Sequence, residues 1–107
     1  MSKSLSVAAL TVLHAVAQGT AHGFDIIDST GLPGGTVYPA LSRLERDGFV
    51  SSSWEDVHIA RADHRPPRRY YRATPLGVRT LNEALGRLHA LKPVRAARAT
   101  RPVRDSR

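Results

Sequence analysis

The sequence contains no cysteine. Disulfide bonds, thiol redox chemistry, cysteine nucleophiles and thiolate metal ligands are therefore excluded. Aromatic residues are few, at 6% of the chain with a single tryptophan. The apolar stretch between Leu5 and Ala17 is broken by polar residues and is shorter than the roughly 18 residues of a membrane helix. With only Lys3 as a basic N-terminal region, the chain is predicted to be cytoplasmic, with no secretion signal and no membrane partner.

Candidate catalytic and metal-binding residues are equally scarce. The Gly-Gly-Thr sequence at residues 34–36 lacks the lysine and the glycine spacing of a phosphate-binding loop. His58, Asp63 and His64 lie near one another, but their spacing is not that of a metal site. No carboxylate pair and no serine–histidine–aspartate set is anchored on a predicted helix or strand. We therefore predict a protein that is not an enzyme, with no catalytic residues, no metal and no cofactor.

The chain does have positive charge, and this charge is unevenly placed. The net charge is +7, of which residues 1–60 carry −3 and residues 61–107 carry +10. A polyanionic partner would therefore meet the second half first. A basic surface kept only for solubility is the alternative explanation. Nucleic-acid binding is favoured, because such clustering is its usual electrostatic footprint.

The first predicted helix covers residues 4–18, with Ser4 as its N-cap and Gly19 just beyond its end. Its apolar residues form two faces rather than one stripe. A helix that is apolar on nearly all sides must be covered on both. In a chain this small, one cover is the protein's own core, and a second subunit is the simplest other cover.

A helix-turn-helix is predicted next. A short helix at residues 22–29 leads through a turn with one proline and two glycines, at residues 32–35, into a helix that starts near Thr36. The helix that starts near Thr36 is predicted to bury three residues at helical spacing: Val37, Leu41 and Leu44. Its other side remains free, and a helix of this kind fits the major groove of B-DNA.

A basic hairpin follows the glycine stop at Gly48. Its strands are predicted at residues 49–57 and 69–73, joined by a polar, proline-containing tip at residues 58–67 that we expect to be a mobile loop. Arginines cluster at this tip and in the returning strand. Such a wing typically follows the DNA backbone and adds salt-sensitive affinity. We expect Trp54 to pack in the core or against the neighbouring helix rather than to serve as a ligand platform.

The last helix is predicted at residues 75–91, after a Thr74 N-cap and a proline at its first position. Nothing left in the chain covers its leucine stripe, so we expect a dimer partner there. From Lys92 onward, basic residues recur at every third position. This spacing aligns them on an extended polyproline-type chain but not on an α-helix. We interpret residues 93–107 as a disordered cationic tail that either lies along phosphates or has no role.

Helix-turn-helix, hairpin and helix in this order predict an α+β, mostly helical fold, a winged helix-turn-helix with a C-terminal dimerisation helix. The DNA-binding domain covers residues 1–73, the dimerisation helix residues 74–92 and the tail residues 93–107. The residues expected to contact DNA are His22, Gly35, Thr36, Tyr38, Pro39, Ser42, Arg43, Arg46, Arg65, Arg68 and Arg69. Those expected at the dimer contact are Leu5, Val7, Leu10, His14, Leu81, Leu85 and Leu88.

Five segments in this order resemble the PadR family of bacterial transcriptional regulators, especially its short members with one C-terminal helix. They are Ala21–Ile26, Gly35–Leu41, Arg43–Gly48, Trp54–Glu55 and Arg69–Gly77. The resemblance covers residues 5–91 and implies a homodimeric winged-helix repressor that dimerises through its first and last helices. It also implies an effector, often a small aromatic or drug-like compound, that alters the affinity for DNA.

The chain departs from the family pattern in several places, among them a long, proline-rich wing tip and the arginine tail. Phe24 stands where the family usually has tyrosine, and Pro-Gly at residues 33–34 replaces a more usual Ser-Pro. The last helix has no tryptophan, so the drug-stacking pocket of some short members is not expected. Our first hypothesis is a homodimeric repressor that binds a pseudo-palindromic operator in double-stranded DNA. The alternatives are a sequence-neutral nucleic-acid-binding or architectural protein that uses the wing and tail, and a protein-interaction module.

Overall fold

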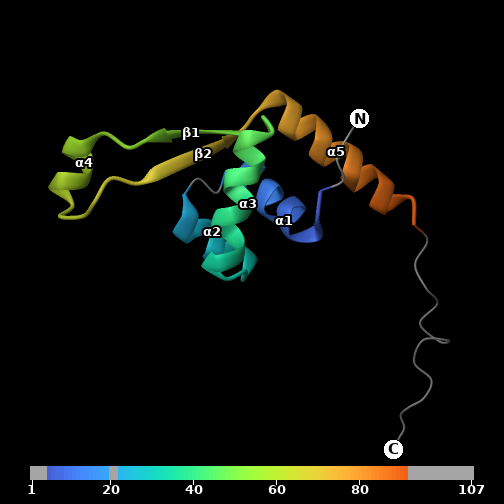
Figure 1. The fold of residues 1–107 in the computed structure, drawn as a ribbon, viewed down its shortest axis with the longest axis horizontal. Coiled ribbons are helices and arrows are strands. Elements are labelled where there is room, and N and C mark those ends of the chain that lie inside the picture. The colour runs from blue at the N-terminus through green and yellow to red at the C-terminus, as the bar shows by residue number, and fades with distance from the viewer. Residues whose placement is uncertain (1–4, 20–21, 92–107) are drawn as a thin grey trace, which may run out of the picture.

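The computed structural model describes residues 5–19 and 22–91, so Ser4 and the predicted tail at residues 93–107 lie outside the described residues. The elements are, in chain order, α1 (Val7–Ala17), α2 (Gly23–Thr30), α3 (Gly34–Arg46), β1 (Val50–Trp54), α4 (Val57–Ala62), β2 (Arg69–Ala73) and α5 (Pro75–His89). Figure 1 shows α1, α2 and α3 grouped together, with the β1–β2 hairpin and α5 leaving this body in opposite directions. The fold is α+β and mostly helical, as predicted.

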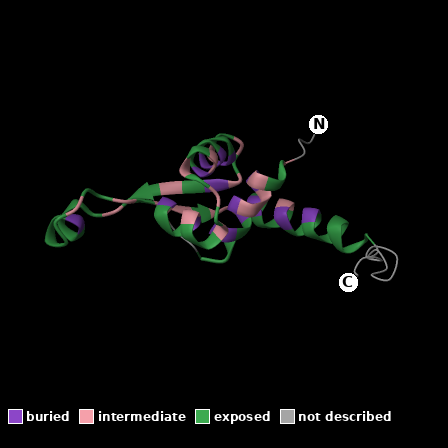
Figure 2. Cartoon of the chain, turned by 90° about the horizontal axis from the view of Figure 1, so that it is seen from below, coloured by how far each residue is buried: buried purple, intermediate pink, exposed green. Residues whose placement is uncertain are grey.

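The core lies where the three central helices meet the base of the hairpin. Figure 2 shows buried residues concentrated in this region and the outer parts of the hairpin and α5 largely exposed. The core residues are Ala9, Val12, Leu13, Ala15, Val16, Ile26, Val37, Ala40, Leu41, Leu44, Val50 and Leu81. The inward-facing residues predicted for the third helix are therefore confirmed.

Local capping interactions determine where the first helices end. Ser6, not Ser4, is the N-cap of α1, because its hydroxyl accepts a hydrogen bond from the Ala9 amide at 3.1 Å. Gly31, with φ of 74°, ends α2, and Gly48, with φ of 84°, follows α3. Both lie in the left-handed region that favours glycine, and the glycine stop predicted at Gly48 is confirmed.

Helix α3 begins at Gly34, earlier than the predicted start near Thr36, with Pro33 as its N-cap. The Pro33 carbonyl accepts hydrogen bonds from the amides of Thr36 and Val37 at 2.9 and 3.0 Å, which closes the first turn. Glycine's weak helix propensity does not prevent this, because these bonds and the packing of the helix outweigh it. Pro39 therefore lies inside the helix rather than in its first turn, and it removes one amide from the helical ladder.

The wing is an antiparallel pair of strands with a helix at its tip. β2 covers the predicted residues, whereas β1 ends at Trp54, three residues early. The tip contains α4, so the prediction of a mobile loop at residues 58–67 was wrong. Asp56 caps this helix, since its carboxylate accepts a hydrogen bond from the His58 amide at 2.8 Å.

The last helix, α5, starts as predicted, with Thr74 as its N-cap and Pro75 at its first position. The Thr74 hydroxyl accepts a hydrogen bond from the Gly77 amide at 3.0 Å and donates one to the Gly48 carbonyl at 2.6 Å. Leu81 attaches the helix to the core. No helix in the described part of the chain, including the 15 residues of α5, is long and apolar enough to cross a membrane.

Candidate nucleic-acid interface

Opposite its buried side, α3 presents an exposed face of small, polar and cationic residues. The exposed members of the predicted DNA-contacting set are Gly35, Tyr38, Pro39, Ser42, Arg43 and Arg46. Thr36 is half-buried at the start of this face. The Arg46 guanidinium forms an ion pair with Asp47 at 3.3 Å. A single α-helix fits the major groove of B-DNA, and the side chains of this face supply hydrogen-bond donors and acceptors that could contact base edges there.

Tyr38 is held against the start of α2. A β-carbon added at Gly23 would lie 2.5 Å from the Tyr38 hydroxyl oxygen and 2.6 Å from a ring carbon. Only glycine therefore allows the tyrosine ring to lie across the N-terminus of α2. The ring is still 46% exposed. The packing fixes the phenol in place while leaving part of it accessible from outside.

His22 connects the helix-turn-helix to the wing. Its backbone forms an isolated antiparallel bridge with Tyr70, and its ring packs edge-on against the Tyr70 ring with centroids 5.6 Å apart. Its Nε2 atom lies 2.9 Å from a carboxylate oxygen of Asp25, and only 12% of the side chain is exposed. The structure thus places this predicted DNA-contacting residue in an internal junction.

The wing tip is held by an ion pair that the sequence pattern did not indicate. The Arg65 guanidinium donates two hydrogen bonds to the Glu55 carboxylate, at 2.6 and 2.8 Å, and the Glu55 side chain is 6% exposed. The Arg68 amide adds a third hydrogen bond to the same carboxylate at 3.1 Å. The hydrogen bond from Arg65, above all, lowers the pKa of Glu55 to about 2, and the same pairing raises the pKa of Arg65.

At the outer end of the strand pair, Arg69 lies between α3 and Trp54. Its guanidinium makes an ion pair with Glu45 of α3 at 3.3 Å and lies 5.4 Å from the centre of the Trp54 ring. Trp54 is 65% exposed, so its prediction as a core or packing residue was wrong. This cation–π contact with Arg69 stabilises the exposed position of the ring.

Within the described part of the chain, four arginines of α3 and the wing make no ion pair with a carboxylate. They are Arg43, Arg61, Arg68 and Arg72. Arg65 and Arg69, by contrast, have their donors directed at the protein itself. The predicted wing cations therefore separate into arginines that are available to phosphates and arginines that brace the wing.

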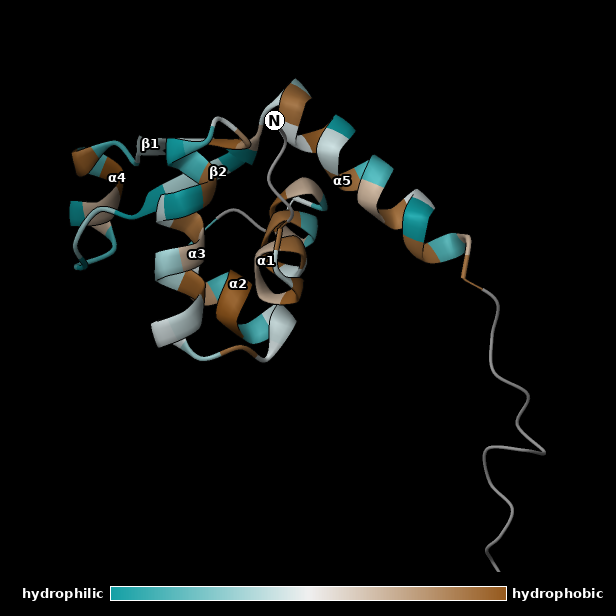
Figure 3. Cartoon of the chain, turned by 45° about the vertical axis from the view of Figure 1, so that its right-hand side comes forward, coloured by the Kyte–Doolittle hydropathy of each residue, from teal (hydrophilic) through white to brown (hydrophobic). Residues whose placement is uncertain are grey.

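A second surface lies between α1 and α5. An apolar groove of about 660 Å³ runs along the two helices and contains every predicted dimer-contact residue: Leu5, Val7, Leu10, His14, Leu81, Leu85 and Leu88. Val7 is 81% exposed and Leu88 57% exposed, although both are apolar. Figure 3 shows hydrophobic bands continuing along α5 beyond the body of the protein. Exposed apolar surface of this kind is typical of an interaction site.

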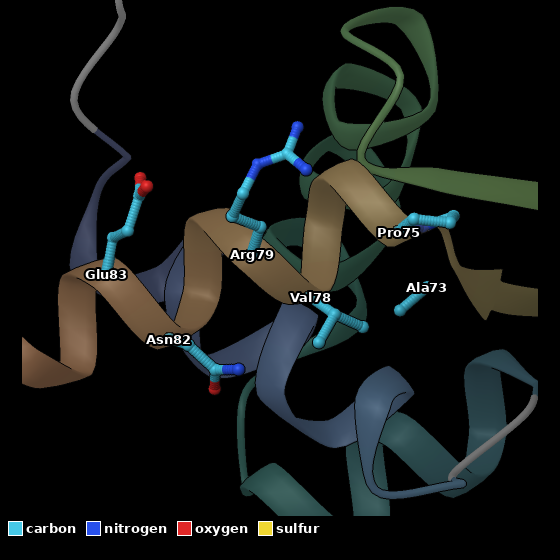
Figure 4. Close-up of a pocket in the computed structure, with 6 residues that line it drawn as sticks. All are labelled: Ala73, Pro75, Val78, Arg79, Asn82 and Glu83. Carbon is cyan, nitrogen blue, oxygen red and sulfur yellow. The ribbon is translucent and has the colours of Figure 1, made fainter.

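The opposite side of α5 carries a shallow hollow, which does not extend the apolar groove. It is formed by Ala73, Pro75 and Val78, with Arg79, Asn82 and Glu83 along its rim (Figure 4). No group of three or more potential metal ligands occurs among residues 5–19 and 22–91.

The arrangement of three helices, a two-stranded wing and a projecting C-terminal helix defines a winged helix-turn-helix protein of the DNA-binding type. The model of the PadR-like family of transcriptional regulators matches residues 12–83. The chain is 39% identical over 79 residues to the transcriptional regulator Rv3488 of Mycobacterium tuberculosis, covering 69% of this chain and 68% of the relative. The chain belongs to the PadR-like family of transcriptional regulators.

Solved structures agree with this assignment. A PadR-like transcription factor from Bacteroides fragilis has a TM-score of 0.65 and 27% identity, covering 76% of this chain and 79% of the other. A PadR family regulator from Clostridium difficile R20291 has a TM-score of 0.69 over 78% and 88% of the two chains. Its identity is 19%, so this second likeness concerns the fold alone.

Proposed function

We propose that this PadR-like regulator is a homodimeric repressor that binds a pseudo-palindromic operator. In this proposal α3 enters the major groove and the wing follows the adjacent backbone, while α1 and α5 pair with a second copy of the chain. The family likeness also supports release from DNA by a small aromatic or drug-like effector. Such an effector would be recognised as a compound that weakens operator binding by the purified protein.

One observation carries the DNA-binding part of the proposal. The exposed polar face of α3 is joined, through Gly48 and β1, to a wing whose Arg68 and Arg72 make no ion pair in the described part of the chain. A helix able to read bases is thus followed directly in the chain by a wing with cations able to contact phosphates. Footprinting on the DNA upstream of the protein's own gene would identify an operator for the following tests.

Thr36 and Arg68 are expected to act on DNA in different ways. Thr36→Val keeps the shape of the half-buried side chain but removes its hydroxyl, so operator affinity should fall by about 1 kcal/mol while random DNA is bound as before. Arg68→Ala should weaken binding to all duplexes and reduce the slope of log affinity against log salt by about 1. Fluorescence anisotropy with an operator duplex and a scrambled duplex measures both effects.

Arg79→Ala is the matched control, because it removes the same charge from α5, at the hollow shown in Figure 4. It should leave both affinities close to those of the unmodified protein. Equal losses on operator and scrambled DNA for Thr36→Val would contradict base reading by α3. An Arg79→Ala variant as impaired as Arg68→Ala would contradict a specific role for the wing.

The charge distribution favours one competing function, a sequence-neutral nucleic-acid-binding or architectural protein. Residues 61–107 carry +10, and much of this charge lies in the tail beyond the described residues. Deleting residues 93–107 separates the two functions. A repressor should retain its preference for operator over scrambled DNA after the deletion, whereas a coating protein should lose most of its affinity for every duplex.

A further inference from the structure

A polar link joins the recognition helix to the wing. The Ser52 hydroxyl in β1 donates a hydrogen bond to Oε2 of Glu45 in α3 at 2.6 Å. The same hydroxyl accepts a hydrogen bond from Nε of Arg69 in β2 at 2.9 Å. An Nη atom of Arg69 then lies 3.3 Å from the other oxygen of Glu45. The three side chains therefore close a ring of contacts between one helix and both strands.

The strand register places this link on the side of the wing that continues from the core. Ser52 lies two residues from the buried Val50, and Trp54 is paired with Arg69, so these side chains share one face of the sheet. Near the body, Val50 anchors that face by burial. Farther out, Tyr71, the partner of Ser52 in the register, still packs against the core, and the polar link adds a direct attachment of both strands to α3.

Arg69 uses its hydrogen-bond donors within the protein. Its Nε and one Nη atom are directed at Ser52 and Glu45, and the guanidinium carbon lies over the Trp54 ring. Its positive charge is balanced by the Glu45 carboxylate. A phosphate would have to break this link to receive the two parallel hydrogen bonds that an arginine fork offers. Arg69 therefore contributes little of the charge that releases counterions from DNA.

We propose that Glu45, Ser52 and Arg69 are positioning residues that fix the angle between the recognition helix and the wing. The inference rests on the proposed function, because the fixed angle matters only if α3 and the wing engage one duplex together. Because the link already holds the wing at a fixed angle to α3, no entropy is lost in ordering the wing when both contact the operator. Breaking it should weaken binding to the operator and leave binding to random DNA unchanged.

Ser52→Ala is the sharpest test, since it changes no charge and removes the hydroxyl shared by the other two residues. We expect operator affinity to fall about five- to tenfold, with the affinity for scrambled DNA and the salt slope unchanged. Ser53→Ala is the matched control, because Ser53 is exposed on the opposite face of the same strand, and it should bind like the unmodified protein. Arg69→Lys, which keeps the charge but loses the fork, should behave like Ser52→Ala.

Trp54 supplies a readout that does not depend on DNA, since it is the single tryptophan of the chain. In the free protein, acrylamide quenching of its fluorescence should increase in Ser52→Ala and Arg69→Lys, and should not change in Ser53→Ala. If the unmodified protein binds no duplex, the proposed function fails, and the quenching comparison still decides whether the link exists. Unchanged quenching, normal operator binding by Ser52→Ala, or an Arg69→Lys variant that binds like the unmodified protein would each overturn the inference.

Discussion

Gly77 stands where α5 passes closest to the residue that precedes β1. A β-carbon added there would overlap the carbonyl oxygen of Phe49 and lie 2.9 Å from its carbonyl carbon. That carbonyl is backbone and already accepts a hydrogen bond from the Thr74 amide at 3.0 Å, so it cannot move aside freely. We predict that Gly77→Ala lowers the free energy of unfolding by about 1–3 kcal/mol, as overpacking does elsewhere. Urea denaturation followed by circular dichroism measures this loss.

Gly86 offers a matched control in the same helix with the opposite expected sign. A β-carbon added at Gly86 meets no atom within 4 Å. Gly86→Ala should therefore raise the free energy of unfolding by about 0.5–1 kcal/mol, because alanine restricts the unfolded chain and favours helix. A stabilised Gly77→Ala variant would contradict the close approach of α5 to Phe49.

At the scale of elements, the wing and the helix after it show which structures can be predicted from neighbouring residues and which cannot. The start of α5 was predictable because Thr74 and the proline after it act within one turn of helix. The helix at the wing tip was not predictable in this way. It is held by the ion pair between Glu55 and Arg65, which are ten residues apart in the sequence. Asp56 was a local signal for this helix, but the two prolines at residues 66–67 suggested a loop.

The candidate DNA-binding surface of α3 and the wing was predictable only in part, for a related reason. The periodicity of α3 identifies its buried and exposed sides, since both follow from spacing within one helix. The separation of the wing arginines into paired and unpaired sets needs the strand register, which composition does not determine. The exposure of Trp54 likewise follows from the register, which places it at the end of the strand pair farthest from the buried Val50.

The Glu55–Arg65 pair makes the order of the wing tip dependent on pH. The pKa of Glu55 is lowered from 4.5 to about 2 in the folded protein, so the pair stabilises the tip fully above pH 4.5. This contribution is lost as the pH falls from 4.5 towards 2. Glu55→Gln should therefore reduce the amide-exchange protection of Arg68, the residue whose N–H binds this carboxylate, at pH 6. The difference from the unmodified protein should shrink towards pH 2.

Asp63→Asn is the control for this experiment. Asp63 also lies near Arg65, at 3.3 Å, but its side chain is 61% exposed. Screening by water makes such a pair worth little, so the variant should follow the unmodified protein at every pH. A constant difference between Glu55→Gln and the unmodified protein across the whole pH range would show that the ion pair is not the source of the order.

At the scale of the whole molecule, the proposed dimer rests on the exposed apolar groove between α1 and α5. The leucine stripe of the last helix was visible in the sequence, and the structure shows that only its first member, Leu81, reaches the core. Leu85 and Leu88 are 37% and 57% exposed, and Val7 of α1 lies beside the same groove. A second copy placing the same surface against this one would cover both helices with a two-fold contact.

Leu88→Glu tests this dimer with little risk to the fold, because the side chain is already exposed in the single chain. The variant should sediment as a monomer at concentrations where the unmodified protein is a dimer. Its operator affinity should fall by about 100-fold or more, because each half-site is then bound separately. Asn82→Glu introduces the same group at the opposite side of α5, at the hollow in Figure 4, and should remain dimeric. A Leu88→Glu variant that sediments as a dimer would place the subunit contact elsewhere, and α5 would then need another partner for its leucines.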